Sequence, residues 1–258
     1  MWPLPLFYIF GQGVNLFFLI FFISTFAAIS LAVWLGQERG VPPVIVLDGC
    51  LIAIISGLAG TRLLSYLMNS VFPRMHQGYW SIAGMVALVF FLWVFARLHP
   101  AMRRSPLESL DVDFPALALY GALARLGCFS AGCCHGKPAW ELPWAVVFNH
   151  PASSSIYRGV PVHPTQLYEA TGDLVILFLL MALRNKPALR GTLIWVYLSA
   201  YGLLRFCVEF YRGDVRPMIG LLSLNQVICV AFITIGTVML ARRFAFSDRG
   251  FATWELQS

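Results

Sequence analysis

Long unbroken runs of apolar residues, separated by polar turns, follow one another along the whole chain. They lie at about 14–35, 45–68, 79–98, 107–131, 164–183, 191–211 and 221–241. Each is close to the ~20 residues that a helix needs to cross a bilayer. Helices of soluble proteins carry an apolar stripe on one face, whereas these runs are apolar without interruption. The pattern predicts an all-α integral membrane protein with about seven transmembrane helices.

The connection over about 132–163 is the one long segment between these runs, and it is rich in Pro, Trp and His. A loop of this length in a compact protein is more often functional than decorative. The other connections are short and carry turn signals and charges. We therefore expect residues 1–258 to form one polytopic membrane domain, with the long loop lying outside the cytoplasm between spans four and five.

Composition supports membrane insertion. The chain is 59% hydrophobic and 12% charged, with a mean hydropathy of +0.75, whereas soluble domains are about 45–50% apolar. This excludes a soluble helical protein. The net charge of +6 does not imply a nucleic-acid partner, because cytoplasmic loops of membrane proteins carry an excess of basic residues.

The distribution of basic residues between the spans predicts the orientation. One side carries Arg39, Arg97, Arg103, Arg104, Arg184, Lys186, Arg190, Arg242, Arg243 and Arg249. The other carries the shorter set of Arg74, Lys137, Arg158, Arg212 and Arg216. By the positive-inside rule the first set faces the cytoplasm. The N-terminus is then expected outside and the C-terminus inside.

Three arginines, Arg62, Arg125 and Arg205, lie within apolar runs. All three belong to spans that run outward, and each lies in the later part of its span. Arg125 and Arg205 are about six residues from the outer ends, roughly 9 Å of helix. Charged residues inside a membrane usually face protein or a water-filled cavity and serve a function. We expect these arginines to meet at one depth near the outer side.

The fifth span begins at the same side with the sequence VHPTQLYEATGD. Gln166, Glu169 and Asp173 are spaced i, i+3, i+7 and share one helix face. Asp173 lies nearly three turns inside, which indicates that this face meets protein or water rather than lipid. The alternative is a plain helix start with solvated polar residues. We interpret the segment from His163 as one wall of a cavity.

In the sixth span Tyr197, Tyr201, Arg205 and Glu209 recur every four residues. Arg205 and Glu209 have the spacing of an i, i+4 ion pair, which is the structural alternative. With Arg125 near the same depth, an anion-binding site is favoured. The planar guanidinium suits phosphate, because it donates two hydrogen bonds at once.

The fourth span ends in ARLGCFSAGCCHGKP, which contains Cys128, Cys133, Cys134 and His135. This spacing matches no standard zinc pattern, and adjacent cysteines fit poorly around one tetrahedral ion. We therefore predict no metal site and no cofactor. Thiols outside the cytoplasm remain candidates for a disulfide or an exposed nucleophile.

Three blocks of the chain resemble the bacterial prolipoprotein diacylglyceryl transferase family: ARLGCFSAGC (124–133), HPTQLYE (163–169) and YGLLRFCVEFYRGD (201–214). A weaker match is GLAGTRLLSY (57–66). The resemblance implies transfer of a diacylglyceryl group from phosphatidylglycerol to the lipobox cysteine of a preprolipoprotein, or to another thiol acceptor, with release of glycerol 1-phosphate. It also implies a multi-pass protein of the bacterial inner membrane.

The resemblance and the residue pattern together define a candidate site. The expected catalytic residues are Arg125, Arg205, His163, Tyr201 and His135. The expected substrate-binding residues are Arg62, Gln166, Tyr168, Glu169, Glu209, Arg212, Cys128 and Cys133. In this scheme the arginines hold the lipid phosphate, and a base accepts the proton of the thiol.

The chain departs from the family pattern at the expected base. Cys128 and Cys133 stand where the family has an Asn and a Glu, and the segment YWSIAGM (79–85) lacks the family's His-Gly-Gly motif. The Tyr-containing motif near the first span is also not evident. By position, His135 or His163 is then the candidate base, with Glu169 as orienting partner.

Two other classes of function remain open at the level of sequence. One is a transporter or lipid-binding protein that uses the same arginines to hold an anion, although no inverted repeat is evident. The other is a thiol-redox protein built on the cysteines of 128–134, although they contain no C-x-x-C pair.

Overall fold

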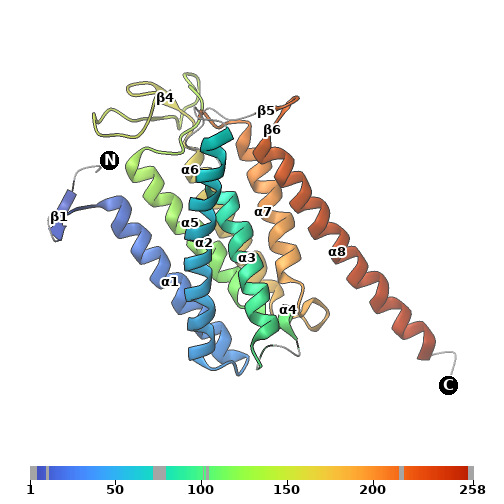
Figure 1. Cartoon of the computed structure of the whole chain (residues 1–258). Coiled ribbons are helices and arrows are strands. Elements are labelled where there is room, and N and C mark those ends of the chain that lie inside the picture. The colour runs from blue at the N-terminus through green and yellow to red at the C-terminus, as the bar shows by residue number, and fades with distance from the viewer. Residues whose placement is uncertain are drawn as a thin grey trace.

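The structure is a computed structural model that describes residues 5–9, 12–71, 80–100, 102, 105–214 and 218–254. Its long helices lie side by side in a bundle (Figure 1). They are α1 (Leu16–Glu38), α2 (Pro43–Val71), α3 (Trp80–Leu98), α5 (Asp113–Ala131), α6 (Thr165–Leu183), α7 (Leu193–Glu209) and α8 (Leu224–Trp254). The shorter helical segments are α4 (Pro106–Leu110) and the 3-10 helix η1 (Pro187–Leu189).

The strands are short and form three antiparallel pairs. They are β1 (Pro5–Ile9) with β2 (Gln12–Asn15), β3 (Val146–Val147) with β4 (Pro161–Val162), and β5 (Met218–Ile219) with β6 (Leu222–Ser223). The segments β4, β5 and β6 lie at one end of the bundle, and α4 lies at the other (Figure 1). Below, the first is called the loop end and the second the α4 end.

The membrane character expected from the apolar runs is confirmed. Within the described residues, five stretches are helical, long and apolar enough to cross a bilayer: Leu16–Glu38, Pro43–Leu63, Pro106–Ala131, Thr165–Leu183 and Leu224–Ala245. The apolar part of α3, Val86–Leu98, is shorter, and α7 has 17 residues. The count of seven spans therefore stays a prediction.

Large apolar side chains cover much of the outer surface of the bundle. Examples are Phe22, Phe26 and Val175, which are 57%, 69% and 62% exposed. In a soluble protein such extended apolar exposure is rare, whereas in a bilayer it faces lipid tails. The surface thus agrees with the membrane character inferred from the helices.

The core lies toward the α4 end, where α5, α6 and α7 meet. Phe114, Leu180 and Leu193 there are 1%, 0% and 0% exposed. Helix α5 packs between α1 and α6, and α7 packs on α8. This arrangement places the last turns of α5 and α7 beside the first turn of α6, at the loop end.

Two helix boundaries differ from the apolar runs. In the fourth run α4 ends at Leu110 and α5 begins at Asp113, although the two residues between them keep right-handed helical dihedral angles. The Asp111 carboxylate accepts hydrogen bonds from the Gly191 and Leu193 amides, just before and at the start of α7. The seventh run was predicted to end near 241, but α8 continues to Trp254. Charged residues end an apolar run without ending a helix, which stops only at a cap or a breaker.

The long loop is fastened to the bundle through Gly136. Its amide donates to the His163 carbonyl at 2.9 Å, and the Gly213 amide donates to the His135 carbonyl at 3.1 Å. A Cβ at Gly136 would lie 2.4 Å from the Cβ of His163 and 2.7 Å from the Tyr211 carbonyl oxygen. Only glycine allows the segments before α6 and after α7 to approach the loop this closely.

Candidate functional site

The centre of the candidate site is the carboxylate of Glu169, in the first turns of α6. It is 1% exposed and forms ion pairs with three arginines from different segments. Arg125 comes from α5, Arg205 from α7 at 3.4 Å, and Arg212 from the turn after α7 at 3.1 Å. The expectation that intramembrane arginines and the start of the fifth span meet at one depth agrees with this arrangement for Arg125 and Arg205, but not for Arg62.

Two further carboxylates complete the cluster. Arg205 Nη1 lies 2.9 Å from Glu209 Oε2, which is the expected i, i+4 pair. Arg212 donates to both oxygens of Asp214, at 2.9 Å and 3.0 Å. Three arginines therefore face three carboxylates. Such matching is needed because an unpaired charge away from water costs several kcal/mol, on the order of 3–5.

The arginines nevertheless offer more donors than the cluster uses. A guanidinium carries five N–H groups. Among the described residues, the buried Nε of Arg205 has no hydrogen-bond partner. The side chain of Arg125 is 16% exposed, against 4% for Arg205 and Arg212. Arg125 is thus the most accessible of the three, and Arg205 holds an unused donor in the buried part of the cluster.

Hydrogen bonds from the next helix fix the far side of the cluster. Glu209 Oε1 accepts from the Ser223 hydroxyl at 2.8 Å and from Asn225 Nδ2 at 3.1 Å. Both donors lie where β6 passes into α8. Because Glu209 also pairs with Arg205, the orientation of that arginine depends on how α7 and α8 pack.

One turn deeper, Asp173 occupies the space left by a glycine on α5. Asp173 is 2% exposed, and a Cβ at Gly121 would lie 2.7 Å from its Oδ2. The prediction that this face of the fifth span meets protein rather than lipid is thereby confirmed.

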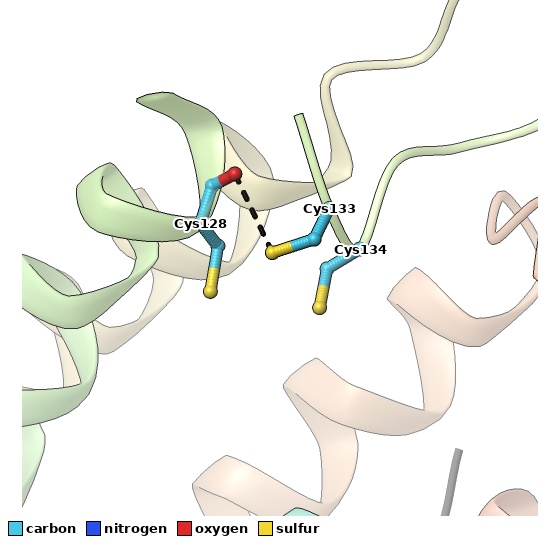
Figure 2. Close-up of side chains that lie close together, drawn as sticks. All are labelled: Cys128, Cys133 and Cys134. Atoms are coloured by element: carbon cyan, nitrogen blue, oxygen red, sulfur yellow. Dashed lines mark hydrogen bonds between the residues drawn. The ribbon is translucent and has the colours of Figure 1, made fainter. Parts of the chain in front are cut away.

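On α5 with Arg125, and just after the helix ends, lie three cysteines whose side chains Figure 2 shows close together. The sulfurs of Cys128, Cys133 and Cys134 are all within 4.8 Å of one another, and all three thiols are free. Hydrogen bonds from the other two thiols, followed by the charges of Arg212 and Arg125, hold the pKa of Cys134 well below its usual value. The sequence predicted neither this proximity nor this polarisation.

The imidazole of His135 is engaged with the backbone on both sides. Nδ1 lies 3.0 Å from the Gly136 carbonyl oxygen, and Nε2 lies 3.3 Å from the Ile156 amide, which must donate to it. The proton therefore resides on Nδ1, and His135 is 4% exposed. Neither nitrogen is left to accept a proton from a substrate.

The imidazole of His163 is in a different situation. Its Nδ1 lies 3.2 Å from the Tyr168 hydroxyl, which also accepts from Trp144 Nε1 at 2.9 Å. Its ring is partly exposed and packs beside Tyr211, with centroids 5.0 Å apart. Burial, and then the charge of Lys137, lower the pKa of His163 below 6.5.

The remaining predicted residues divide between supporting and distant positions. Gln166 Nε2 donates to the Cys133 carbonyl at 2.6 Å, so it fastens the cysteine segment to α6. Tyr201 stacks on Tyr197 with centroids 5.6 Å apart. Arg62 is exposed on α2, and no described ion pair joins it to the cluster.

Sequence reasoning missed Asp214 and the anchors Ser223 and Asn225. Asp214 stands two residues after Arg212 in YRGD, so its signal was the short spacing of opposite charges. Ser223 and Asn225 gave no signal, because they meet Glu209 only through the packing of α7 on α8.

Comparison with known proteins gives matches over most of the chain. The family model described as prolipoprotein diacylglyceryl transferase matches residues 5–242. A phosphatidylglycerol–prolipoprotein diacylglyceryl transferase of Clostridium tetani is 28% identical over 240 residues, covering 90% of this chain and 94% of the relative. One from Synechocystis is 31% identical over 229 residues, covering 81% and 78%. One from Rhodospirillum centenum is 40% identical over 129 residues, covering 46% and 44%.

Proposed function

The chain belongs to the prolipoprotein diacylglyceryl transferase family, and we propose that it transfers a diacylglyceryl group from phosphatidylglycerol to a cysteine thiol of a prolipoprotein. Glycerol 1-phosphate leaves. The observation that supports this most strongly is the convergence of Arg125, Arg205 and Arg212 on one buried carboxylate, with a donor of Arg205 unused.

The arginines suit the phosphodiester of the lipid. Arg125, the most exposed of the three, meets the phosphate first and donates with its free N–H groups. The buried Nε of Arg205, which has no partner among the described residues, is a second donor. Glu169 holds the guanidiniums in place without neutralising their hydrogen-bonding capacity, so the donors are oriented before the lipid arrives. Preorganised donors of this kind stabilise charge that develops in a transition state.

The reaction forms one bond and breaks one. The sulfur of the acceptor attacks the carbon of the diacylated glycerol that carries the phosphate, and a thioether forms. The bond from this carbon to the phosphate oxygen breaks, and the electron pair leaves with glycerol 1-phosphate. Negative charge therefore grows on the phosphate during the step, where the arginines stabilise it.

The acceptor thiol must lose its proton to become a nucleophile. His163 is the better placed of the two candidate bases, since both nitrogens of His135 are occupied. In the tautomer that has its proton on Nδ1, His163 donates to the Tyr168 hydroxyl and presents a lone pair on Nε2. Its lowered pKa keeps it neutral, and thus able to accept a proton, around neutral pH.

The proposal extends to the placement of the protein in the membrane. The positive-inside rule puts the α4 end in the cytoplasm and the loop end outside. The cluster around Glu169 then lies at the depth of the outer-leaflet headgroups of a bacterial inner membrane, where phosphatidylglycerol and an exported lipoprotein precursor both reach it. The N-terminus lies outside and the C-terminus inside, in one polytopic domain.

The decisive test is a transfer assay. Purified protein is reconstituted in vesicles that contain phosphatidylglycerol and is mixed with a peptide that carries a lipobox cysteine. We expect mass spectrometry to show a peptide heavier by one diacylglyceryl group, together with released glycerol 1-phosphate. A peptide with Ser in place of this Cys serves as the negative control.

The assay also separates the alternatives. Failure to modify the peptide, under conditions where the Clostridium tetani relative modifies it, would refute the proposed reaction. Transport or binding of lipid without a covalent product would support the transporter reading. Lipid-independent oxidation of the peptide thiol would support the redox reading.

A further inference from the structure

The three cysteines at the end of α5 are not used by the proposed reaction, although they lie beside its arginines. Their sulfur atoms lie within 4.8 Å of one another. Figure 2 shows the sulfurs converging, with that of Cys133 between those of Cys128 and Cys134. We propose that these three sulfurs bind one zinc ion.

The distances fit a zinc–thiolate centre. Zn–S bonds are ~2.3 Å long, so tetrahedral geometry separates the sulfurs by ~3.8 Å. Sulfurs that are within 4.8 Å need to close by no more than about 1 Å. A disulfide needs ~2.05 Å between sulfurs and uses only two of the three thiols. A metal ion is the partner that engages all of them.

The backbone at Cys134 overcomes the difficulty of adjacent cysteine ligands. In an extended chain, successive side chains point to opposite sides, which argued against a metal in the sequence. Cys134 has φ 59°, and it is the one non-glycine residue with positive φ in the described part of the chain. This left-handed conformation is unfavourable for a side chain and occurs mainly at functional sites. Here the positive φ of Cys134 occurs where the thiols of Cys133 and Cys134 lie close together.

The start of α6 holds this conformation in place. The Thr165 hydroxyl donates to the Cys134 carbonyl at 2.7 Å, and Gln166 Nε2 donates to the Cys133 carbonyl at 2.6 Å. The thiols are therefore positioned by neighbouring segments before any ion binds. Such support from surrounding hydrogen bonds is typical of metal sites.

The charge of the complex also suits its neighbours. A zinc ion with three thiolates carries a net charge of −1. Arg125 precedes Cys128 by three residues on α5, about one helical turn, and supplies a positive charge nearby. Thiolates are soft ligands that select zinc over magnesium or calcium.

Within the described residues, these three cysteines are the one group of His, Cys, Asp or Glu that meets as a set of possible ligands. The neighbouring His135 is occupied by backbone partners. The fourth position on zinc is therefore left to water. Three protein ligands and an open position are characteristic of reactive rather than purely structural zinc sites.

The test is the metal content of full-length protein purified in detergent under reducing conditions from zinc-supplemented cells. We expect about one zinc ion per chain in the wild type, the stoichiometry of a single site. Cys128→Ser, Cys133→Ser and Cys134→Ser should each lose most of it. Cys207→Ser, which alters an exposed cysteine on α7, is the matched control and should keep it.

A second measurement protects the test against variants that fold poorly. Cobalt exchanged into the wild type should give a sulfur-to-cobalt charge-transfer band in the near ultraviolet, and a zinc chelator should remove zinc reversibly. Folded, reduced wild-type protein without zinc and without this band would overturn the proposal. So would a disulfide between two of the three cysteines in protein alkylated at cell lysis. Neither readout depends on the transfer reaction.

Discussion

Two buried carboxylates at opposite ends of the bundle, Asp111 and Glu169, have very different surroundings. Asp111, at the α4 end, accepts hydrogen bonds from the Gly191 and Leu193 amides at 2.6 Å and 3.0 Å, and Arg39 lies 3.6 Å away. Glu169, at the loop end, forms ion pairs with the side chains of three arginines.

The difference separates a structural carboxylate from a positioning one. Asp111 accepts hydrogen bonds from amides at the start of α7 that have no partner within the helix, so its role is to stabilise the fold. Glu169 holds long cationic side chains whose donors exceed the available acceptors, as the unpartnered Nε of Arg205 shows. A cluster with donors to spare is suited to receiving an anion.

The largest expected effect comes from Arg125→Ala. Removing the most accessible arginine takes away donors to the developing phosphate charge, and we expect the transfer rate to fall by about 10²–10³-fold. The measurement is the rate of peptide modification with phosphatidylglycerol vesicles. Arg125→Lys should remain impaired, because lysine keeps the charge but loses the planar fork.

Arg39→Ala is the matched control for the other end of the bundle. Arg39 also approaches a buried carboxylate and donates to the Glu108 carbonyl at 2.8 Å. We expect its loss to leave the rate per folded molecule unchanged. Equal losses in the two alanine variants would show that the two ends do not differ in function.

Glu169→Gln should chiefly affect stability. The substitution leaves three buried or half-buried arginines short of one negative charge, and we expect a loss of about 3–5 kcal/mol in the free energy of unfolding. Thermal unfolding in detergent measures this. A variant as stable as the wild type would contradict the account of Glu169 as the organiser of the cluster.

Asp111→Asn should cost less, because one acceptor oxygen remains. One amide at the start of α7 loses its partner, and we expect a loss of about 1–3 kcal/mol. The transfer rate per folded molecule should be unchanged. Reduced transfer at normal stability would assign Asp111 a part in the reaction.

The smallest expected effect concerns pH. His163 accepts a proton only when it is neutral, and its pKa is lowered below 6.5. Transfer should therefore persist below pH 6.5 and fail as the imidazole protonates at lower pH. Lys137→Ala removes the second of the two causes of the lowered pKa and should move this acid limb to higher pH. Lys186→Ala, at the opposite end, should not move it.

Much of the candidate site was predictable from the order of the spans. Alternating direction places the ends of the fourth and sixth spans beside the start of the fifth, so Arg125, Arg205 and Glu169 were expected together. Details that depend on loop conformation were not predictable. The left-handed backbone of Cys134 and the capture of His135 by the Ile156 amide arise from how the long loop folds back, for which the sequence carries no periodic signal.

The helix boundaries also show which features local patterns predict and which they do not. The apolar runs predicted most ends of the long helices to within a few residues, because hydrophobicity over ~20 residues is a strong signal. They did not predict the end of α8, which continues past 241 to Trp254. The hydrogen bonds to the Asp111 carboxylate were not predicted, since the amides that donate them lie some 80 residues later in the chain. Contacts between distant segments lie outside what local patterns report.

The central claim is that the arginine cluster holds the phosphate of the lipid, and binding without chemistry tests it most directly. The measurement is the affinity for phosphatidylglycerol in detergent, compared with diacylglycerol, which lacks the phosphate. We predict that the wild type prefers phosphatidylglycerol and that Arg125→Ala loses this preference while Arg39→Ala keeps it. An unchanged preference in folded Arg125→Ala would contradict the account.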